Sequence, residues 1–262
     1  GNSTNYGIID NWSDMRDGIA SSGAGFILTN AMGAFIYTSG EDAYGIYGWE
    51  AIAINAGLIE TTGDYGIGID SGSNSIATNS GILRTYGDNA NAMSGYDNTS
   101  LTNAATGSIH TYGDYSAGVV ADDYSTAANL GSITTELFDA PGMIASWYST
   151  ATNAGTIPTL GTYSSGMLST SGSTITNSNQ VRTEGAMASG RDASDSASAS
   201  NMGTIITSGD SSYGMEADGT ATVTNAGTIS TTGSGAHGMS VNDALTETNS
   251  GTIDTTGANA SG

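Results

Sequence analysis

The 262-residue sequence contains no cysteine and no lysine. Without cysteine, a disulfide framework, thiolate chemistry and zinc-finger spacing are all excluded. The only basic residues are four arginines, whereas acids number 25, so the net charge is −21. A chain this acidic repels phosphate backbones and anionic lipid surfaces. We therefore expect neither nucleic acid nor a membrane surface as a partner.

Long hydrophobic runs are also missing. No apolar stretch approaches the ~20 residues that cross a bilayer, and no basic segment precedes one as in a signal peptide, so the sequence predicts neither. Charged residues make up only 11% of the chain, against roughly 25% in ordinary globular domains. The motifs G-x-S-x-G and H-E-x-x-H and the phosphate-binding loop are absent, which argues against these enzyme classes.

One motif, Asn-Ala-Gly-x-Ile-x-Thr-x-Gly, recurs along the whole chain. Clear copies begin at Asn55, Asn153 and Asn225, and successive copies start 24 to 26 residues apart. The leading asparagines are Asn5, Asn30, Asn55, Asn79, Asn103, Asn129, Asn153, Asn177, Asn201, Asn225 and Asn249. A period this strict predicts a single repeat domain over residues 1–262.

Each repeat holds three short strand-like pieces separated by glycine-rich turns. The first, Gly-x-Ile-x-Thr, alternates with period two, so Ile and Thr share one face, which we take to point inward. The second centres on pairs such as Gly166-Met167. The third leads into the next asparagine and carries an apolar residue, such as Leu101, two places before it. Glycine and β-branched residues are too dense for helices.

Three short strands cannot bury an apolar face alone, but stacked repeats can. The sequence therefore predicts an all-β, three-sided parallel β-helix, or β-solenoid, with about 24 residues per coil and about 11 coils. With rungs ~4.8 Å apart, the rod would be roughly 50 Å long. A leucine-rich repeat has a similar period but needs a leucine scaffold, and leucine is sparse here.

The asparagines stack at one corner in this arrangement. We expect them to form a structural ladder of amide-to-amide hydrogen bonds along the axis. The ladder comprises Asn55, Asn79, Asn103, Asn129, Asn153, Asn177, Asn201, Asn225 and Asn249.

The repeated N-A-G-T-I-x-T-x-G unit resembles the degenerate repeats of bacterial autotransporter-type passenger and adhesin β-helices. The resemblance extends from Asn5 to Gly257. It implies a right-handed parallel β-helix at the bacterial cell surface, and it specifies architecture rather than activity.

Acidic residues recur in the turn that follows the first strand of each repeat. Stacked carboxylates either recruit cations or form a solvated edge that keeps the rod soluble. Asp64, Asp88 and Asp114 are the candidate Ca²⁺ ligands at this edge, and Ca²⁺ is the only cofactor considered. A sparser second column, for which we favour solvation, consists of Asp97, Asp123, Asp195 and Asp243.

The outward face of the first strands offers the other candidate cluster. Arg84 should lie between Glu60 and His110, where an ion pair between coils is the simplest interpretation. Tyr86 and Tyr112 form the best patch for a glycan, with Asp88 and Asp114 beside them, since paired carboxylates can hydrolyse glycosidic bonds. The column between Ile and Thr is too irregular for the flat threonine array of an ice-binding solenoid.

Two coils break the pattern. Pro158 lies inside a first strand, where it should remove one hydrogen bond between strands. In the segment 190–200, Arg191 stands where neighbouring repeats have Met, and we expect a bulge or register shift there.

Together these features predict an extracellular structural or adhesive surface protein that is not an enzyme. The first repeat begins at Asn5 and the last stops after Gly257, part-way through a coil. Two explanations stay open: the chain is a fragment of a longer passenger, or open coil ends stack head to tail into a filament. The alternative function is a glycan-binding or glycan-cleaving β-helix, with surface glycans as partners.

Overall fold

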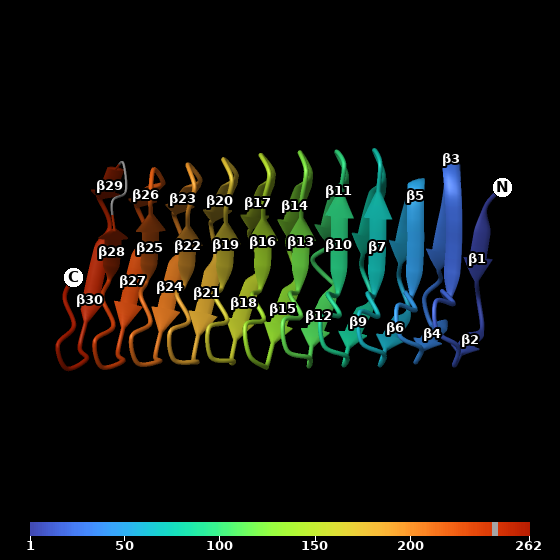
Figure 1. Ribbon diagram of the computed structural model, residues 1–262, viewed down its shortest axis with the longest axis horizontal. Coiled ribbons are helices and arrows are strands. Elements are labelled where there is room, and N and C mark those ends of the chain that lie inside the picture. The colour runs from blue at the N-terminus through green and yellow to red at the C-terminus, as the bar shows by residue number, and fades with distance from the viewer. Residues whose placement is uncertain (243–245) are drawn as a thin grey trace.

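The computed structural model describes residues 1–242 and 246–262, and this part of the chain contains strands and no helix. Every recorded strand pair is parallel, and the strands form one 11-stranded and one 19-stranded sheet. Coils follow one another along the long axis, so the two chain ends lie at opposite ends of the rod (Figure 1). The expected all-β parallel solenoid of about 24 residues per turn is confirmed, with ten full turns between the first and last strands of the 11-stranded sheet.

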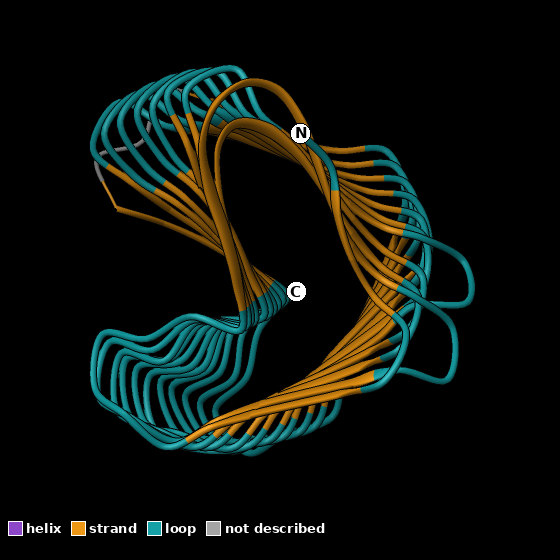
Figure 2. Cartoon of the chain, turned by 90° about the vertical axis from the view of Figure 1, so that its right-hand side faces the viewer, coloured by secondary structure: helices purple, strands orange, loops and turns teal. Residues whose placement is uncertain are grey.

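Viewed along the axis, the coils superpose and their strands form three columns (Figure 2). The first column is the 11-stranded sheet: β2 (Ile8–Asn11), β4 (Phe35–Thr38), β6 (Leu58–Thr61), β9 (Ile82–Thr85), β12 (Ser108–Thr111), β15 (Ser132–Thr135), β18 (Thr156–Thr159), β21 (Gln180–Thr183), β24 (Thr204–Thr207), β27 (Thr228–Thr231) and β30 (Thr252–Thr255).

The 19-stranded sheet supplies the other two columns. The second column is β7 (Ile69–Gly72), β10 (Met93–Tyr96), β13 (Val119–Ala121), β16 (Met143–Ala145), β19 (Met167–Ser169), β22 (Arg191–Ala193), β25 (Met215–Asp218) and β28 (Met239–Asn242). The third is β1 (Ser3–Asn5), β8 (Ile76–Asn79), β11 (Ser100–Asn103), β14 (Thr126–Asn129), β17 (Thr150–Asn153), β20 (Thr174–Asn177), β23 (Ser198–Asn201), β26 (Thr222–Asn225) and β29 (Thr246–Asn249). The long strands β3 (Ile19–Asn30) and β5 (Ile46–Asn55) run through both columns.

The first strand of each coil points its Ile and Thr side chains inward. Ile133 and Ile157 are fully buried, as is the threonine two residues after each. Several of these threonines fasten the turn that follows: Thr38 Oγ1 donates to the carbonyl of Ala43 at 2.9 Å, and Thr159 Oγ1 donates to that of Ser164 at 2.7 Å. In these coils the hydroxyl is satisfied inside the core, whereas those of Thr85, Thr111 and Thr135 are buried without a hydrogen-bond partner.

The asparagines stack at the corner between the third column and the next coil. Each Nδ2 donates to the Oδ1 of the asparagine one coil further along, at 2.8 to 3.0 Å. This chain of bonds runs without a break from Asn5 to Asn249. Those from Asn30 to Asn225 are buried, and the terminal Asn249 is exposed. Repetition thus satisfies a polar column that would be costly to bury as single residues.

The two irregular coils behave differently. Between β15 and β18 the paired residues are Ser132 with Thr156 and Thr135 with Thr159, so pairing is interrupted beside Pro158 as expected. The bulge expected at Arg191 is wrong: β22 pairs in register with both β19 and β25. The guanidinium is instead buried in the core. A register shift occurs between Ser22 and Phe26 of β3, where no irregularity was expected.

Candidate functional site

On one side of the solenoid the second-column strands lie between two stacks of turns (Figure 2), and two hollows open along this side. In each of these strands the first residue points into the core, so the second points outward onto the groove floor. We call this feature the lateral groove. Its main floor column, one residue per rung in register, is Tyr47, Asp70, Ser94, Val120, Ile144, Leu168, Asp192, Glu216 and Ser240.

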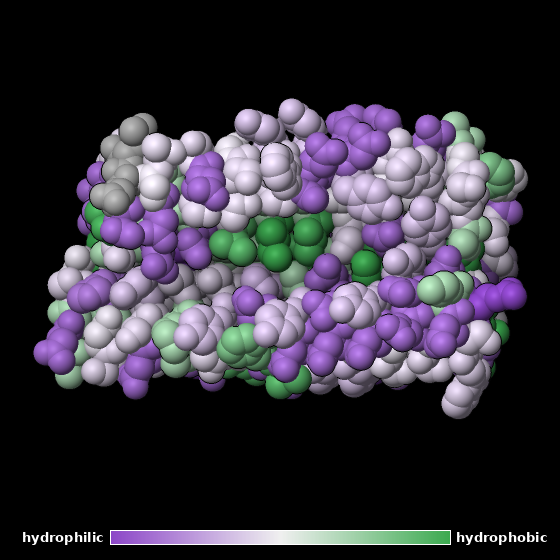
Figure 3. Space-filling view, in the orientation of Figure 1, coloured by the Kyte–Doolittle hydropathy of each residue, from purple (hydrophilic) through white to green (hydrophobic). Residues whose placement is uncertain are grey.

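The middle of the groove floor is apolar. Val120, Ile144 and Leu168 follow one another on β13, β16 and β19 and are half-buried. The space-filling view shows a hydrophobic band over these strands, with hydrophilic side chains on either side (Figure 3). An apolar strip rimmed by polar groups is a common feature of ligand sites.

Beyond Leu168 the groove widens into a hollow of about 530 Å³, which we call the C-terminal hollow. Asp192 and Glu216 lie side by side on its floor, on adjacent rungs. Aromatic rings wall it, and Phe138 meets Tyr163 edge to face with centroids 5.4 Å apart. Carboxylates and aromatic faces together can bind the hydroxyls and the apolar face of a sugar.

The electrostatics of this hollow favour protonated carboxylates. Burial and, to a lesser extent, the nearby carboxylates of Glu216 and Asp218 raise the pKa of Asp192 to about 7. Burial also raises the pKa of Glu216, against a hydrogen bond of 2.8 Å that Ser189 Oγ donates to its Oε2. Within the described residues, no ion pair joins either carboxylate to a cation.

At the opposite end of the apolar strip is a second hollow, of about 510 Å³, which we call the N-terminal hollow. Its lining consists of Met15, Asp17, Asp42, Tyr44, Tyr47, Asp70 and Tyr96. Asp70 is only 6% exposed, although it belongs to the groove floor. Three tyrosines and three aspartates therefore meet in one recess without a basic residue among them.

The acidic turn proposed for Ca²⁺ has a structural role in the solenoid. Asp64 Oδ1 accepts a hydrogen bond from the backbone N–H of Asp88 at 3.0 Å, and Asp88 Oδ1 accepts one from that of Asp114 at 2.9 Å. Asp114 Oδ1 in turn accepts from the N–H of Phe138 at 2.9 Å. Each carboxylate thus ties its coil to the next one.

Among the described residues, no three His, Asp or Glu side chains are grouped so that they could hold a metal ion. Calcium binding at this edge stays a prediction. In the second acidic column, Asp97 and Asp123 have φ of 56° and 49°, the left-handed turn conformation that Asp tolerates. Asp243 lies outside the described residues.

The flat face of the 11-stranded sheet carries the other predicted cluster. Tyr86 and Tyr112 stack with ring centroids 4.5 Å apart, and Arg84 Nη1 lies 3.7 Å from Glu60 Oε2. The expected contact between Arg84 and Glu60 is therefore present.

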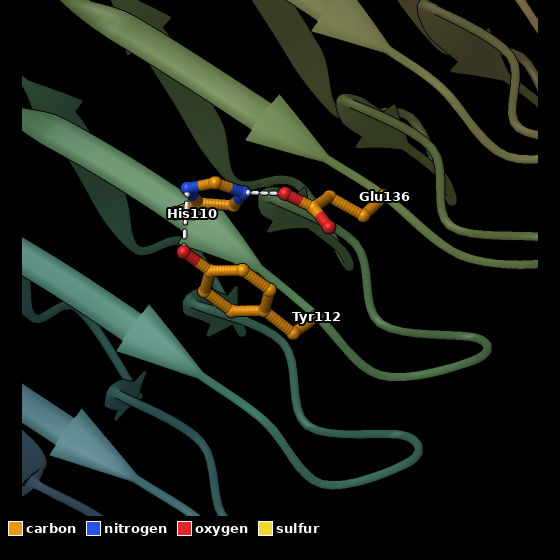
Figure 4. Close-up of polar contacts among 3 residues, drawn as sticks. All are labelled: His110, Tyr112 and Glu136. Carbon is orange, nitrogen blue, oxygen red and sulfur yellow. Dashed lines mark hydrogen bonds and ion pairs between the residues drawn. The ribbon is translucent and has the colours of Figure 1, made fainter.

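Two contacts on this face join His110 to its neighbours. Its Nε2 lies 2.6 Å from Glu136 Oε1, and its Nδ1 lies 3.0 Å from the Tyr112 hydroxyl (Figure 4). Both ring nitrogens of His110 therefore have partners within the cluster. One oxygen each of Asp88 and Asp114, the carboxylates expected beside the tyrosine patch, accepts a backbone hydrogen bond in the turn. Glycan binding at this patch stays a prediction.

Sequence reasoning missed the lateral groove. Its floor residues follow the Gly-Met pairs by one position, and the repeat pattern alone assigns no role to this column. The signal that could have found it is the succession Val120, Ile144, Leu168, Asp192 and Glu216 at a spacing of 24 residues. Three apolar residues in a row at an outward position are unusual on a solvated face.

The fold and the groove define a parallel β-solenoid with a lateral ligand-sized cleft. Residues 65–189 match the family model described as the BigA third pectate lyase-like domain, which is less than half of the chain. This match supports a β-helix repeat. No curated protein and no solved structure matches the chain. Within the described residues, no helix is long and apolar enough to cross a membrane.

The raised pKa of Asp192 predicts how stability depends on pH. In the folded state this carboxyl keeps its proton up to about pH 7, whereas the ordinary pKa of an aspartate, expected in the unfolded chain, is 3.8. The folded state therefore binds more protons between pH 4 and 7, and its stability falls as pH rises through this window. Asp192→Asn should remove this loss. At pH 8 its free energy of unfolding should exceed that of the wild type by about 1–2 kcal/mol, because partial solvent exposure reduces the full effect of the shift.

Denaturant unfolding at pH 5 and pH 8 measures this difference. The matched control is Asp10→Asn, which neutralises an exposed carboxylate on β2 of the other sheet. The control should leave the pH dependence of the wild type unchanged. An equal gain from both variants at pH 8 would show that overall charge, rather than burial of Asp192, sets the effect.

Proposed function

We propose that this chain is a rigid β-solenoid segment of a bacterial surface protein, displayed outside the cell, and that it acts by presenting a binding surface rather than by catalysis. The observation that carries this proposal is the unbroken asparagine ladder, which holds successive coils in one register. Supporting it are the match of residues 65–189 to the BigA domain model and the adhesin-like repeats.

Antibody labelling of intact cells of the source bacterium tests the display. We expect labelling without permeabilisation, and labelling only after permeabilisation would contradict surface exposure. Electron microscopy of the purified chain tests assembly. Rods of a single length, roughly 50 Å for eleven rungs, would indicate a stalk segment, whereas continuous fibres would indicate head-to-tail stacking of coil ends.

A second candidate function is glycan binding in the C-terminal hollow. It is favoured by the aromatic wall of Phe138 and Tyr163 beside the carboxylates of Asp192 and Glu216. The excess of acids makes polyanionic sugars poor ligands. We therefore propose uncharged surface glycans as the partners of this part of the groove.

Binding of neutral oligosaccharides to the wild type and to two variants tests this candidate. Tyr163→Ala should weaken binding about tenfold or more, because it removes a stacking face from the wall. Tyr86→Ala is the control, since it removes a ring from the stacked pair on the flat face. Equal losses in both variants, or binding unaffected by Tyr163→Ala, would place the glycan elsewhere.

A further inference from the structure

The N-terminal hollow combines aromatic rings with one buried carboxylate. Tyr44 and Tyr47 lie with ring centroids 6.0 Å apart, inclined by 34°. Tyr96 joins them from two rungs along, and its own ring is 5.8 Å from that of Trp49. The rings of Tyr44, Tyr47 and Tyr96 therefore come from two coils and border one recess, with the coil that carries Asp70 between them.

Asp70 occupies the middle of this arrangement. In register it lies between Tyr47 of β5 and Ser94 of β10. Although it is 94% buried, its carboxylate is bonded only by the backbone N–H of Ser71, and no cation among the described residues pairs with it. A buried carboxylate without a counter-charge is costly unless it takes up a proton or a cation enters from outside.

Gly72 has no side chain, and this leaves space for the neighbouring rings of Tyr96 and Trp49. A Cβ built on Gly72 would lie 2.6 Å from the ring of Tyr96 and 3.0 Å from that of Trp49. The two rings therefore close over a position that has no side chain. Any larger residue there would push them apart, so the recess depends on this glycine.

We propose that the N-terminal hollow binds an alkylated ammonium cation, such as a trimethylammonium group, between its tyrosine rings and the carboxylate of Asp70. Aromatic faces attract such cations through their quadrupole, and a nearby carboxylate supplies the opposite charge. A quaternary ammonium also has little need of hydrogen bonds, which suits a recess bordered by aromatic rings. The hollow is five rungs from Asp192, so this inference is independent of the proposed glycan site.

The other titratable groups of the recess also favour a bound cation. Burial and, to a lesser extent, the neighbouring Asp17 carboxylate raise the pKa of Asp70 to about 7. Facing it are Asp17, Asp42, Tyr44, Tyr47 and Tyr96, all acidic or neutral. A bound cation favours the ionised carboxylates, so affinity should increase as pH rises from 6 to 8.

Calorimetric titration with choline tests the proposal against its uncharged carbon analogue, 3,3-dimethylbutan-1-ol. The wild type should bind choline at least about tenfold more tightly than the analogue, because only choline carries the charge. Asp70→Asn should abolish this preference. It replaces a buried charge by a neutral side chain of the same shape, so the fold is expected to persist. Gly72→Ala should weaken choline binding by separating the rings.

The control variant is Asp10→Asn on the opposite sheet, which should bind choline as the wild type does. Phosphocholine distinguishes the source of the ammonium group: binding as tight as that of choline indicates a headgroup, and weaker binding indicates a free ammonium compound. Equal affinity for choline and its carbon analogue would overturn the proposal, as would unchanged choline binding by Asp70→Asn. The glycan test with Tyr163→Ala is independent of these results, because it concerns the C-terminal hollow.

Discussion

Replacement of Arg191 by methionine is expected to raise the free energy of unfolding by about 3 kcal/mol or more. Arg191 is fully buried at the position where β19 and β25 carry Met167 and Met215. Its Nη1 donates to the carbonyl of Ser200, while Nε and Nη2 have no partner. Methionine at this position would continue the buried methionine column, and the uncompensated charge would be gone.

Denaturant unfolding of the wild type and of Arg191→Met measures this gain. The matched control is Arg182→Met, which removes a half-exposed arginine paired with Glu184 on the outer face. The control should change stability by no more than about 0.5 kcal/mol. A destabilised Arg191→Met would show that the guanidinium is compensated within the core.

The same residue predicts a pH effect in the alkaline range. Burial lowers the pKa of Arg191 to about 9 from its usual 12.5. Below pH 9 both folded and unfolded chains hold the proton, so the penalty of the buried charge is complete. Above pH 9 the folded chain releases the proton first, and the wild type gains stability relative to Arg191→Met. The gap between the two proteins should therefore be smaller at pH 10 than at pH 7.

Arg191 also shows why one charged residue in a buried column does not change the register of its strand. The sequence suggested that this coil would shift its register, because a charged residue stood in the methionine column. A slip by one residue would turn every side chain of the strand to the opposite face. The strand keeps its register on both sides, and the small core residues Ala193, Ala197 and Ala199 line the interior of the same coil. Pairing with two neighbours therefore outweighs the cost of one misplaced charge.

The inward columns could be predicted because they depend only on period and alternation. Ile, Thr and Asn recur at fixed positions, and stacking brings equal positions together. The lateral groove depends instead on the path of the turns. Tyr163, which lines the C-terminal hollow, has a φ of 61°, a left-handed conformation that is uncommon for residues with large side chains. Sequence propensities give no sign of it, so the wall of the groove became visible only in the structure.

The second large effect is expected from interrupting the asparagine ladder in its middle. Asn153 Nδ2 donates to Asn177 Oδ1 at 2.9 Å and to the carbonyl of Gln180 at 3.1 Å. Its Oδ1 accepts from Asn129 Nδ2 at 2.8 Å and from the N–H of Gly155 at 3.2 Å. Asn153→Leu removes all four bonds. Asn177 Oδ1 then keeps only the N–H of Asn179 at 3.3 Å, and Asn129 Nδ2 keeps only the carbonyl of Thr156 at 3.4 Å. At about 1–3 kcal/mol for each buried amide that loses its short bond, the loss should reach roughly 2–5 kcal/mol.

The terminal rung provides the matched control, because water can replace the hydrogen bonds that the same substitution removes there. Asn249 is exposed, and its Oδ1 accepts from Asn225 Nδ2 at 2.9 Å. Asn249→Leu should therefore cost about 1 kcal/mol or less. Similar losses at both positions, measured by denaturant unfolding, would contradict the ladder as a source of stability. In the double variant Asn153→Leu/Asn177→Leu, both partners of one bond disappear together, so its loss should be smaller than the sum of the two single losses. That shortfall would identify the bond between neighbouring asparagines as the coupling that holds successive coils in register.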